Sequence, residues 1–401
     1  MTRTVVPLPD SAHLLDRVPL AEPSLTGREW QYVRECLDTG WVSSVGAFVN
    51  RFEADVAAAA GARHGVATVN GTAALHLALR VAGVGPGDTV LVPALTFIAP
   101  VNAVRYTGAH PVFIDAEPDY WQMDVEQVRD FLLRRCSREP GGLCDRATGR
   151  RVAAVLPVHL LGHPVDLEQL VPLCRDLGVA VIEDATESLG AHHRGTPVGH
   201  LGDAACFSFN GNKLITTGGG GMFVTDDEEW ARRARHLSTQ AKTDPVEYEH
   251  DEVGYNYRLT NVLAALGVAQ MEQLHDKIAA KQAIAARYAA ELKSIPGLTP
   301  MPEAPWASSV FWLYTILVDE RQFGCDSRAL LRRLGERGIQ TRPLWQPMHQ
   351  SPAHRDEAPA HCPVADRLHR QALSLPCSVS LSVSAQMRVI DAIGEVCHDV
   401  A

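Results

Sequence analysis

The sequence lacks paired cysteine motifs, a long apolar run and an excess of positive charge. Its nine cysteines are scattered and form no Cys-x-x-Cys pair, so neither a disulfide framework nor a zinc site is indicated. No apolar run approaches the roughly 20 residues that span a bilayer. The first residues contain Pro, Asp and His and so lack the apolar centre of a signal peptide. We therefore expect a cytoplasmic protein with reduced thiols and no membrane partner.

The charge balance excludes another class of protein. The formal net charge is -10, which argues against a protein that wraps nucleic acid. A small anionic ligand needs only a local site and stays possible. Hydrophobic residues make up 46% and charged residues 21%, as in ordinary globular enzymes. A chain of 401 residues is long enough for a large domain and a smaller one.

Short apolar runs alternate with helical patterns through the first half of the chain. Helical patterns such as 71–84 and 166–178 separate many of the runs. Strands that alternate with helices predict an α/β fold with a mostly parallel, seven-stranded sheet covered on both faces. The predicted strands are 65–70, 89–95, 110–116, 151–160, 179–185, 204–209 and 220–225.

The second half predicts a smaller α+β domain. Helix-forming residues from Asn261 to about Leu292 predict one long helix that leaves the large domain. A strand at 312–318 and a helix at 327–338 follow it. We place the domains at 1–265 and 266–401, and the N-terminal segment is free to pack on the smaller one.

One basic, glycine-rich segment, 134–151, lies between a predicted helix and a predicted strand. We interpret it as a solvated loop. The alternative is that its arginines contact a phosphate-bearing ligand.

A lysine precedes four glycines in FSFNGNKLITTGGGG, residues 207–221. A P-loop requires Ser or Thr after its lysine, whereas Leu214 follows Lys213. A flexible hairpin is the simplest alternative for the glycines. His159 and His163 lie four residues apart, but Gly162 and Pro164 interrupt the helix that would align them, so we expect no metal site.

A second motif, Asn70-Gly71-Thr72-Ala73, follows a predicted strand and begins a predicted helix. The first turn of a helix has N–H groups without helical acceptors and carries the positive end of the dipole, so it can bind phosphate. Plain helix capping by Asn70 or Thr72 is the alternative.

Two further features suit a flat heterocyclic ligand. Glu183 and Asp184 end a predicted strand, and α/β sheets bind ligands at the carboxyl ends of strands. An ionised Asp beside a pyridine nitrogen keeps that nitrogen protonated. Glu187 would share a helical face with Asp184, and Phe97 could stack on a ring. The alternatives are a capping acid and a core aromatic.

A phosphate site, a carboxylate, an aromatic face and a lysine are together what pyridoxal phosphate requires. Lys213 would form the Schiff base and then carry the proton between carbon and nitrogen. Small residues after the lysine would let a ring approach the backbone closely.

The chain resembles the DegT/DnrJ/EryC1/StrS family of sugar aminotransferases, which are fold-type I pyridoxal-phosphate enzymes. It is most similar to the branch acting on UDP-4-keto-6-deoxy-N-acetylhexosamines in bacillosamine and legionaminic acid pathways, through DTGWVSSVG, FNGNKLITTGGGG and GIQTRPLWQPMH. The family segments, in family order, are GWVSSVGAFVNRFE (40–53), NGTAALHLAL (70–79), VPALTF (92–97), PVHLLGHPVD (157–166), EDATESLG (183–190), FSFNGNK followed by ITTGGGG, and GYNYRLTNVLAALG (254–267).

The resemblance implies roles for individual residues. Lys213 would hold the cofactor covalently, and Asp184 would pair with the pyridine nitrogen. Glu187 would lie near the ring hydroxyl, where the family more often has His or Gln. Phe97 would stack on the ring, and Asn256 would reach the phosphate of the neighbouring subunit's cofactor in a homodimer. Phosphate would be held by Gly71, Thr72, Ala73 and Ser208.

The resemblance also implies the reaction. An amino group would pass from glutamate to the keto carbon, C4 by our interpretation, of a nucleotide-linked keto-deoxy sugar such as UDP-4-keto-6-deoxy-N-acetylglucosamine. The alternatives are C3 of a dTDP- or GDP-linked sugar and an eight- or nine-carbon keto sugar acid. Candidate substrate contacts are Trp41, Ser43, His159, Arg258, Arg342 and Trp345.

Two other functions compete with this interpretation. A dehydratase of the family that uses pyridoxamine phosphate carries His in place of the lysine, so Lys213 argues against it. The second is a non-enzymatic regulator of the same fold that binds a sugar nucleotide or cofactor, and the intact lysine, aspartate and phosphate site argue against it.

Overall fold

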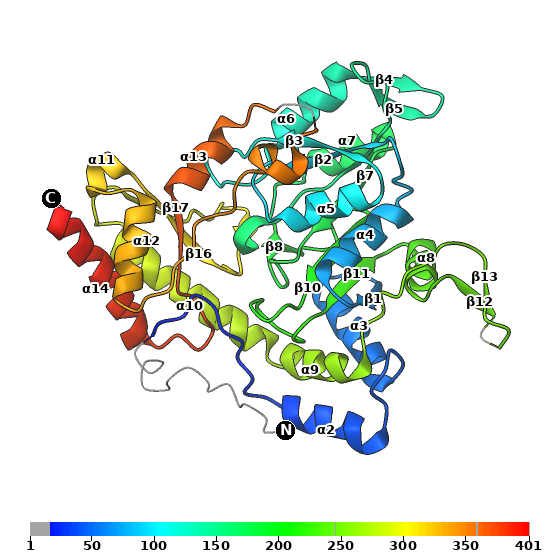
Figure 1. Cartoon of the computed structure of the whole chain (residues 1–401), viewed down its shortest axis with the longest axis horizontal. Coiled ribbons are helices and arrows are strands. Elements are labelled where there is room, and N and C mark those ends of the chain that lie inside the picture. Colours follow the sequence, from blue (N-terminus) through cyan, green and yellow to red (C-terminus); the bar gives the residue numbers. More distant parts are fainter. Residues whose placement is uncertain (1–16, 245, 358–359, 401) are drawn as a thin grey trace, which may run out of the picture.

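A seven-stranded sheet forms the centre of the larger part of the molecule (Figure 1). The computed structural model describes residues 17–244, 246–357 and 360–400. All seven predicted strands belong to this one sheet, so the predicted fold class is confirmed. In spatial order they are β1 (His64–Thr68), β11 (Gly221–Thr225), β10 (Ala204–Ser208), β7 (Ala180–Asp184), β6 (Val152–Val155), β2 (Thr89–Pro93) and β3 (His110–Ile114).

Strand direction places the ends of six strands at one edge. Pairing is parallel from β10 through β7, β6 and β2 to β3, and only β11 runs the opposite way, antiparallel to β1 and β10. The segments that leave the carboxyl ends of β1, β2, β7 and β10 therefore meet at the same edge, where α/β sheets bind ligands.

Both faces of the sheet are covered, which explains why its strands are almost wholly apolar. Cys206 and Phe223 face α4 (Gly71–Val81), whereas Phe207 and Met222 face α3 (Ala47–Ala59) and α9 (Asn261–Met271). The helices α6 (Val125–Asp130) and α7 (Leu170–Leu177) cover the rest of this second face. The other helices of the sheet-bearing part are α2 (Glu29–Thr39), α5 (Ile98–Tyr106) and α8 (Glu228–Ser238).

A second, three-stranded antiparallel sheet lies in the left part of Figure 1. It consists of β14 (Leu298–Pro300), β16 (Tyr314–Val318) and β17 (Ala372–Leu375). The helices around it are α10 (Leu274–Leu292), α11 (Glu320–Phe323), α12 (Ser327–Glu336), α13 (Pro363–Gln371) and α14 (Val383–Val400). Among the described residues, no helix combines the length and apolar character needed to cross a membrane.

The long helix predicted from Asn261 to Leu292 was wrong in one respect, because the structure has two helices. The helix is interrupted at Glu272 and Gln273, between α9 and α10. The Gln273 side chain donates to Glu29 of α2 at 3.0 Å and to the carbonyl of Ala269 at 3.0 Å. The contact with Glu29 joins segments distant in the sequence, so helix propensity alone does not reveal the break.

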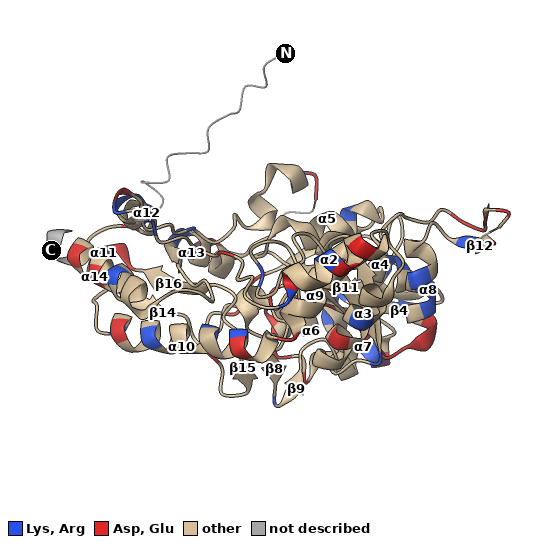
Figure 2. Ribbon diagram, turned by 90° about the horizontal axis from the view of Figure 1, so that it is seen from below, with Lys and Arg blue, Asp and Glu red and all other residues tan. Residues whose placement is uncertain are grey.

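The segment 134–151 also differs from the predicted loop. It forms the hairpin of β4 (Cys136–Glu139) and β5 (Gly142–Asp145), with Pro140 and Gly141 at its turn. A second hairpin, β12 (Lys242–Asp244) with β13 (Glu249–His250), projects from the end of the molecule opposite α14 (Figure 2). In a small three-stranded sheet, β8 (His192–His193) pairs with β15 (Ala307–Ser308) on one side and with β9 (Thr196–Pro197) on the other.

Candidate active site

A cavity of about 230 Å³ opens at the carboxyl edge of the large sheet. The segments after β1, β2, β7 and β10 all contribute to it, as strand direction requires. Seven residues predicted for the site line this one cavity: Gly71, Thr72, Phe97, Glu187, Ser208, Lys213 and Trp345. The remaining lining residues are Asn70, Leu75, Ala99, Thr186, Asn210, Asn212, Gly219, Gly220 and Trp312.

The start of α4 forms one end of the cavity, beside the end of β10. Gly71 packs so closely on Ser208 that a Cβ at Gly71 would lie 2.8 Å from the Ser208 Cβ. Asn70 caps the helix by accepting the N–H of Ala73 at 2.8 Å. The structure therefore bears out the capping alternative for Asn70. Ala73, which was predicted to hold phosphate, donates its N–H to this cap and is not among the residues that line the cavity. Gly71, Thr72 and the Ser208 hydroxyl are left to receive an anion at the positive end of the helix dipole.

Asp184 ends β7 and is buried, and it is not itself among the residues that line the cavity. It pairs in register with Cys206, which faces α4, whereas Glu183 pairs with Ala205 on the opposite face. Burial raises the pKa of Asp184, and hydrogen bonds from Thr186 and the charge of Lys213 partly oppose this rise. A cation in contact with Asp184, such as a protonated ring nitrogen, would favour its ionised form.

Glu183 has a structural role. Its carboxylate accepts hydrogen bonds from the backbone N–H groups of Gly199, Leu201 and Gly202 and from Nε2 of His159. These hydrogen bonds outweigh the cost of burial and lower the pKa of Glu183. The two neighbouring acids thus serve different faces of the sheet, and only Asp184 faces the cavity side.

Lys213 lies in the turn after β10, and its side chain is 14% exposed. Its Nζ is 3.5 Å from Oε1 of Glu187 and 4.0 Å from the ring centroid of Trp312. Burial raises the pKa of Glu187 to about 7, although Lys213 and the Leu161 N–H oppose the rise. The lysine is therefore placed between a carboxyl group that titrates near neutrality and an aromatic face.

Aromatic side chains form one wall of the cavity. Trp345 stacks on Trp312 with a centroid distance of 6.2 Å and an interplanar angle of 3°. Phe97 meets Trp345 edge-on at 6.2 Å, and half of its own side chain is exposed. These rings offer flat apolar surfaces beside Lys213, which suits a planar ligand.

His159 lies away from the cavity although the sequence suggested a substrate contact. It is fully buried, and its Nδ1 accepts the N–H of Val165 at 2.9 Å. The proton is therefore on Nε2, which donates to Glu183 at 2.9 Å. Both ring nitrogens are used in holding two loops together, and neither is free to contact a substrate.

Of the other predicted substrate contacts, Trp345 lines this cavity, and the remaining four lie outside it. Arg258 pairs with Glu53 at 2.7 Å, close to the end of β1. Trp41 and Ser43 lie in the loop before α3, and their carbonyls accept from Asn261. Arg342 lines a separate cavity of about 580 Å³. Asn256 is exposed and pairs through its backbone with Thr239, so within its own chain it does not reach Lys213's cavity.

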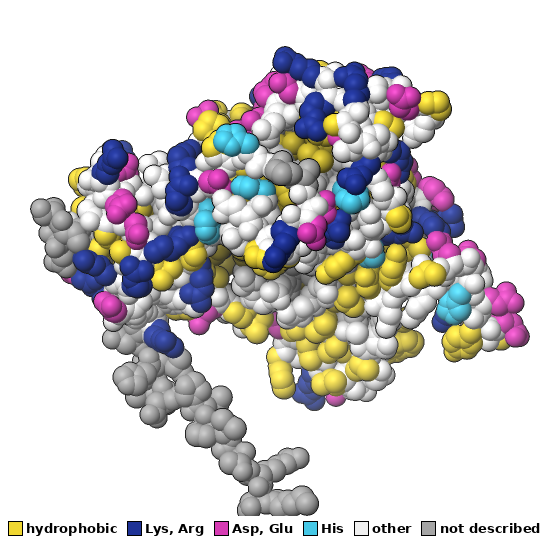
Figure 3. Space-filling model, turned by 45° about the horizontal axis from the view of Figure 1, so that its top comes forward, with side chains coloured by type: hydrophobic (Ala, Val, Ile, Leu, Met, Phe, Trp, Pro, Cys, Tyr) yellow, Lys and Arg dark blue, Asp and Glu magenta, His cyan; other side chains and the backbone are white. Residues whose placement is uncertain are grey.

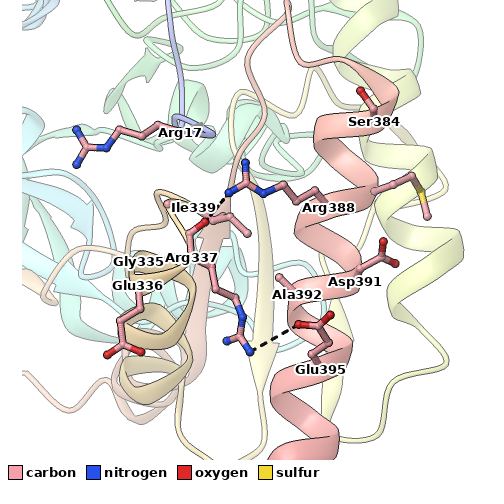
Figure 4. Close-up of a pocket in the computed structure, with 12 residues that line it drawn as sticks. Arg17, Gly335, Glu336, Arg337, Ile339, Ser384, Arg388, Asp391, Ala392 and Glu395 are labelled. Carbon is pink, nitrogen blue, oxygen red and sulfur yellow. Dashed lines mark hydrogen bonds and ion pairs between the residues drawn. The ribbon is translucent and has the colours of Figure 1, made fainter. Parts of the chain in front are cut away.

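A larger cavity, of about 1170 Å³, lies between α12 and α14 (Figure 4). Arg337 and Glu395 pair across it at 3.6 Å, and Arg388 donates to the carbonyl of Arg337. Among the described residues that line it, basic and acidic side chains balance, and it holds no lysine or aromatic ring. Its chemistry offers less to a covalently held cofactor than the smaller cavity does.

Trp312 is the most important lining residue that sequence reasoning missed. It begins the predicted strand 312–318 and was not named as a site residue, and in the structure it is 4% exposed. The indole N–H donates to the carbonyl of Asn212, 100 residues away in the chain, at 2.8 Å. No local pattern signals a contact between segments so far apart.

The residues of this cavity fit pyridoxal phosphate. The Gly71–Ser208 cradle would hold the phosphate, Asp184 would face the ring nitrogen, and Lys213 would supply the covalent anchor. Fold, cavity and these side chains together define the class: this is a fold-type I, pyridoxal-phosphate-dependent transferase.

Comparison with known proteins identifies the family. Residues 23–394 match the DegT/DnrJ/EryC1/StrS aminotransferase family, and the chain belongs to it. It is 38% identical over 382 residues to the GDP-perosamine synthase of Escherichia coli O157:H7, covering 95% of this chain and 99% of that protein. It is 35% identical over 349 residues to the UDP-N-acetyl-3-dehydro-alpha-D-glucosamine 3-aminotransferase of Acidithiobacillus ferrooxidans, covering 86% and 88%.

A solved structure extends the similarity to the fold. The structure of DesV from S. venezuelae in complex with a ketimine intermediate matches with a TM-score of 0.85 and 34% identity. The match covers 96% of this chain and all of that chain. The protein is therefore a pyridoxal-phosphate-dependent sugar aminotransferase that acts on a nucleotide-linked keto sugar with an amino donor.

Proposed function

We propose that this enzyme transfers an amino group from glutamate to the C4 keto carbon of a nucleotide-linked keto-deoxy sugar. The observation that carries the proposal is the position of Lys213, whose Nζ lies 3.5 Å from Glu187 in the cavity that Gly71 and Ser208 close at one end. A lysine so placed can take a proton from a substrate carbon and return it to another.

Each residue around Lys213 has a task in this scheme. Bound pyridoxal phosphate supplies the electron sink and carries the amino group. Asp184 would keep the ring nitrogen protonated, and the start of α4 with Ser208 would hold the phosphate. Phe97 would contact the ring, and Glu187 lies beside the lysine that would move the proton. The sugar then occupies the open side of the cavity, next to Trp345.

The sugar nucleotide is the finest part of the proposal. The family resemblance favours UDP-4-keto-6-deoxy-N-acetylglucosamine as the substrate. The similarity to a protein named GDP-perosamine synthase makes a GDP-linked keto sugar the main alternative. The test is to incubate the enzyme and glutamate with UDP-, GDP- and dTDP-linked 4-keto sugars, and to identify each product by mass and NMR. Amination of none of them, with 2-oxoglutarate also not formed, would refute the proposal.

Amination at C3 is the second candidate. It is supported by the similarity to a protein named as a 3-aminotransferase of a UDP-linked sugar. The same incubations should include a UDP-linked 3-keto sugar, because NMR of the product distinguishes a nitrogen at C3 from one at C4.

We also propose that the enzyme works as a homodimer with shared sites. Large apolar side chains are exposed between residues 25 and 45, namely Leu25, Trp30, Leu37, Trp41, Val42 and Val45. Apolar side chains also gather on the face shown in Figure 3. Exposed clusters of this kind commonly mark an interface with another protein. Asn256, exposed and outside its own cavity, is then available to the partner's cofactor phosphate.

Mixed dimers test this arrangement. Lys213→Ala and Asn256→Ala should each impair activity when made alone. When the two variants are co-expressed and pair at random, about half of the dimers are mixed, and each mixed dimer has one of its two sites with both residues intact. Activity should therefore return to about a quarter of the wild-type value. If co-expression gives no more than the two variants give alone, Asn256 does not act across the dimer.

A further inference from the structure

Trp312 contacts the Lys213 segment in two ways. Its ring centroid lies 4.0 Å from the Lys213 Nζ, within the range of a cation–π interaction. Its indole N–H donates to the carbonyl of Asn212 at 2.8 Å, which fixes the backbone immediately before the lysine. One side chain thus holds both the amino group and the peptide that carries it.

The backbone of Trp312 is itself held in place by a buried lysine. The buried side chain of Lys281, on α10, donates to the carbonyl of Trp312 at 2.7 Å. The same ammonium contacts Cys377, with the Sγ at 2.8 Å and the carbonyl as a further acceptor. Trp345 stacks on the indole ring. The backbone contact with Lys281, the stacking on Trp345 and the hydrogen bond from the indole N–H to Asn212 together fix the orientation of the ring.

Two acids share the surroundings of Lys213 with this ring. Glu187 is 3.5 Å from Nζ, and Asp184 lies close enough for the Lys213 charge to affect it. Glu187 loses its charge when it is protonated, and burial raises its pKa to about 7. The attraction of an aromatic face for a cation does not titrate, so Trp312 stabilises the ammonium over the whole neutral range.

We propose that the Trp312 face is the resting place of the Lys213 ammonium whenever this lysine is not joined to the cofactor. Trp312 is then a positioning residue that retains a proton on Lys213 until the substrate carbon receives it, and Lys281 keeps Trp312 in place. This inference rests on the proposed proton-carrying role of Lys213 but not on the identity of the sugar.

The test uses the cofactor-free full-length protein, so its result does not depend on the sugar substrate. Lys213 is methylated with formaldehyde and a borohydride reagent across a pH series, and its labelling rate is followed by peptide mass spectrometry. Only the neutral amine reacts. In Trp312→Leu the profile should move to lower pH, so that the rate below the midpoint rises about fivefold. The plateau rate at high pH reports access to the lysine separately.

Graded variants keep the test decisive. Trp312→Phe retains a ring but loses the indole N–H, and should raise the rate below the midpoint about twofold. Lys281→Met should shift the profile in the same direction, since the ring loses its support. Trp230→Leu, at a partly buried tryptophan on α8 that does not line the cavity, is the control and should leave the profile unchanged.

The overturning results are equally clear. If Trp312→Leu changes only the plateau, the ring merely shields the lysine and the proposal is wrong. Should Trp312→Leu fail to fold, an unshifted profile in both Trp312→Phe and Lys281→Met would overturn it. A failure of sugar amination with a shifted profile would refute the proposed function and leave this inference standing.

Discussion

Lys213 and Glu187 face each other inside the active-site cavity, with Nζ 3.5 Å from Oε1. The other oxygen of Glu187 accepts the N–H of Leu161 at 2.8 Å, and the side chain is almost fully buried. Burial raises the pKa of this carboxyl group to about 7, so its charge changes in the physiological range. The pair therefore links the charge around the reactive lysine to pH.

Replacing Glu187 should remove a specific pH dependence of stability in the cofactor-free protein. Between its ordinary pKa and about 7, Glu187 binds a proton in the folded state but not in the unfolded state. Folding stability due to this group is present at low pH and is lost as pH rises through this window. The free energy of unfolding of wild type should therefore fall between pH 5 and pH 8 by on the order of 2 kcal/mol more than that of Glu187→Gln.

Urea unfolding of both proteins at the two pH values measures this difference. A constant difference between Glu187→Gln and wild type at pH 5 and pH 8 would show that the carboxyl group does not titrate between them.

Lys213→Ala should abolish covalent retention of the cofactor. We expect turnover to fall by at least about 1000-fold, since no other described side chain in the cavity supplies an amine for proton transfer. The measurement is the visible spectrum after addition of pyridoxal phosphate, followed by a turnover assay. Lys293→Ala, at an exposed lysine, is the matched control and should behave as wild type. Substantial transamination by Lys213→Ala would end the assignment.

The strands of the large sheet could be predicted because burial on both faces makes each of them an apolar run. Cys206 and Phe207, adjacent in β10, face different helices yet are both fully buried, so the run reads the same from either side. Asp184, which ends β7, and Lys213, which follows β10, could be placed at the same edge of the sheet for a related reason. Parallel strands bring their carboxyl ends together whatever the details of packing.

The rest depended on contacts between distant segments. Trp312 reaches Asn212 across 100 residues, and Glu183 differs from Asp184 only through the loop at 199–202 that it binds. His159 looked like a substrate residue because its use by Glu183 is visible only in three dimensions. The local sequence shows which chemical group a side chain has, but it does not show which partner that group binds in the folded protein.

Substitutions of the adjacent acids Glu183 and Asp184 should have different effects, one on stability and the other on turnover. Asp184→Asn removes the charge proposed to face the ring nitrogen, so turnover should fall about 100-fold or more while the fold is retained. Glu183→Gln leaves N–H donors of the 199–202 loop poorly matched, so the free energy of unfolding should fall by about 1–3 kcal/mol. Turnover per folded molecule and urea unfolding separate the two effects. A wild-type rate in Asp184→Asn would mean that it does not face the ring nitrogen.

Gly71→Ala should weaken cofactor binding through crowding at the phosphate site. The added Cβ would lie 2.8 Å from the Ser208 Cβ and 3.2 Å from the Thr186 side chain, so α4 or β10 must shift. Overpacking of this kind costs about 1–3 kcal/mol, which predicts a roughly tenfold or greater rise in the Kd for pyridoxal phosphate. Gly85→Ala is the matched control, since a Cβ there meets nothing within 4 Å. Fluorescence titration of both variants measures the difference, and equal Kd values would show that the phosphate is held elsewhere.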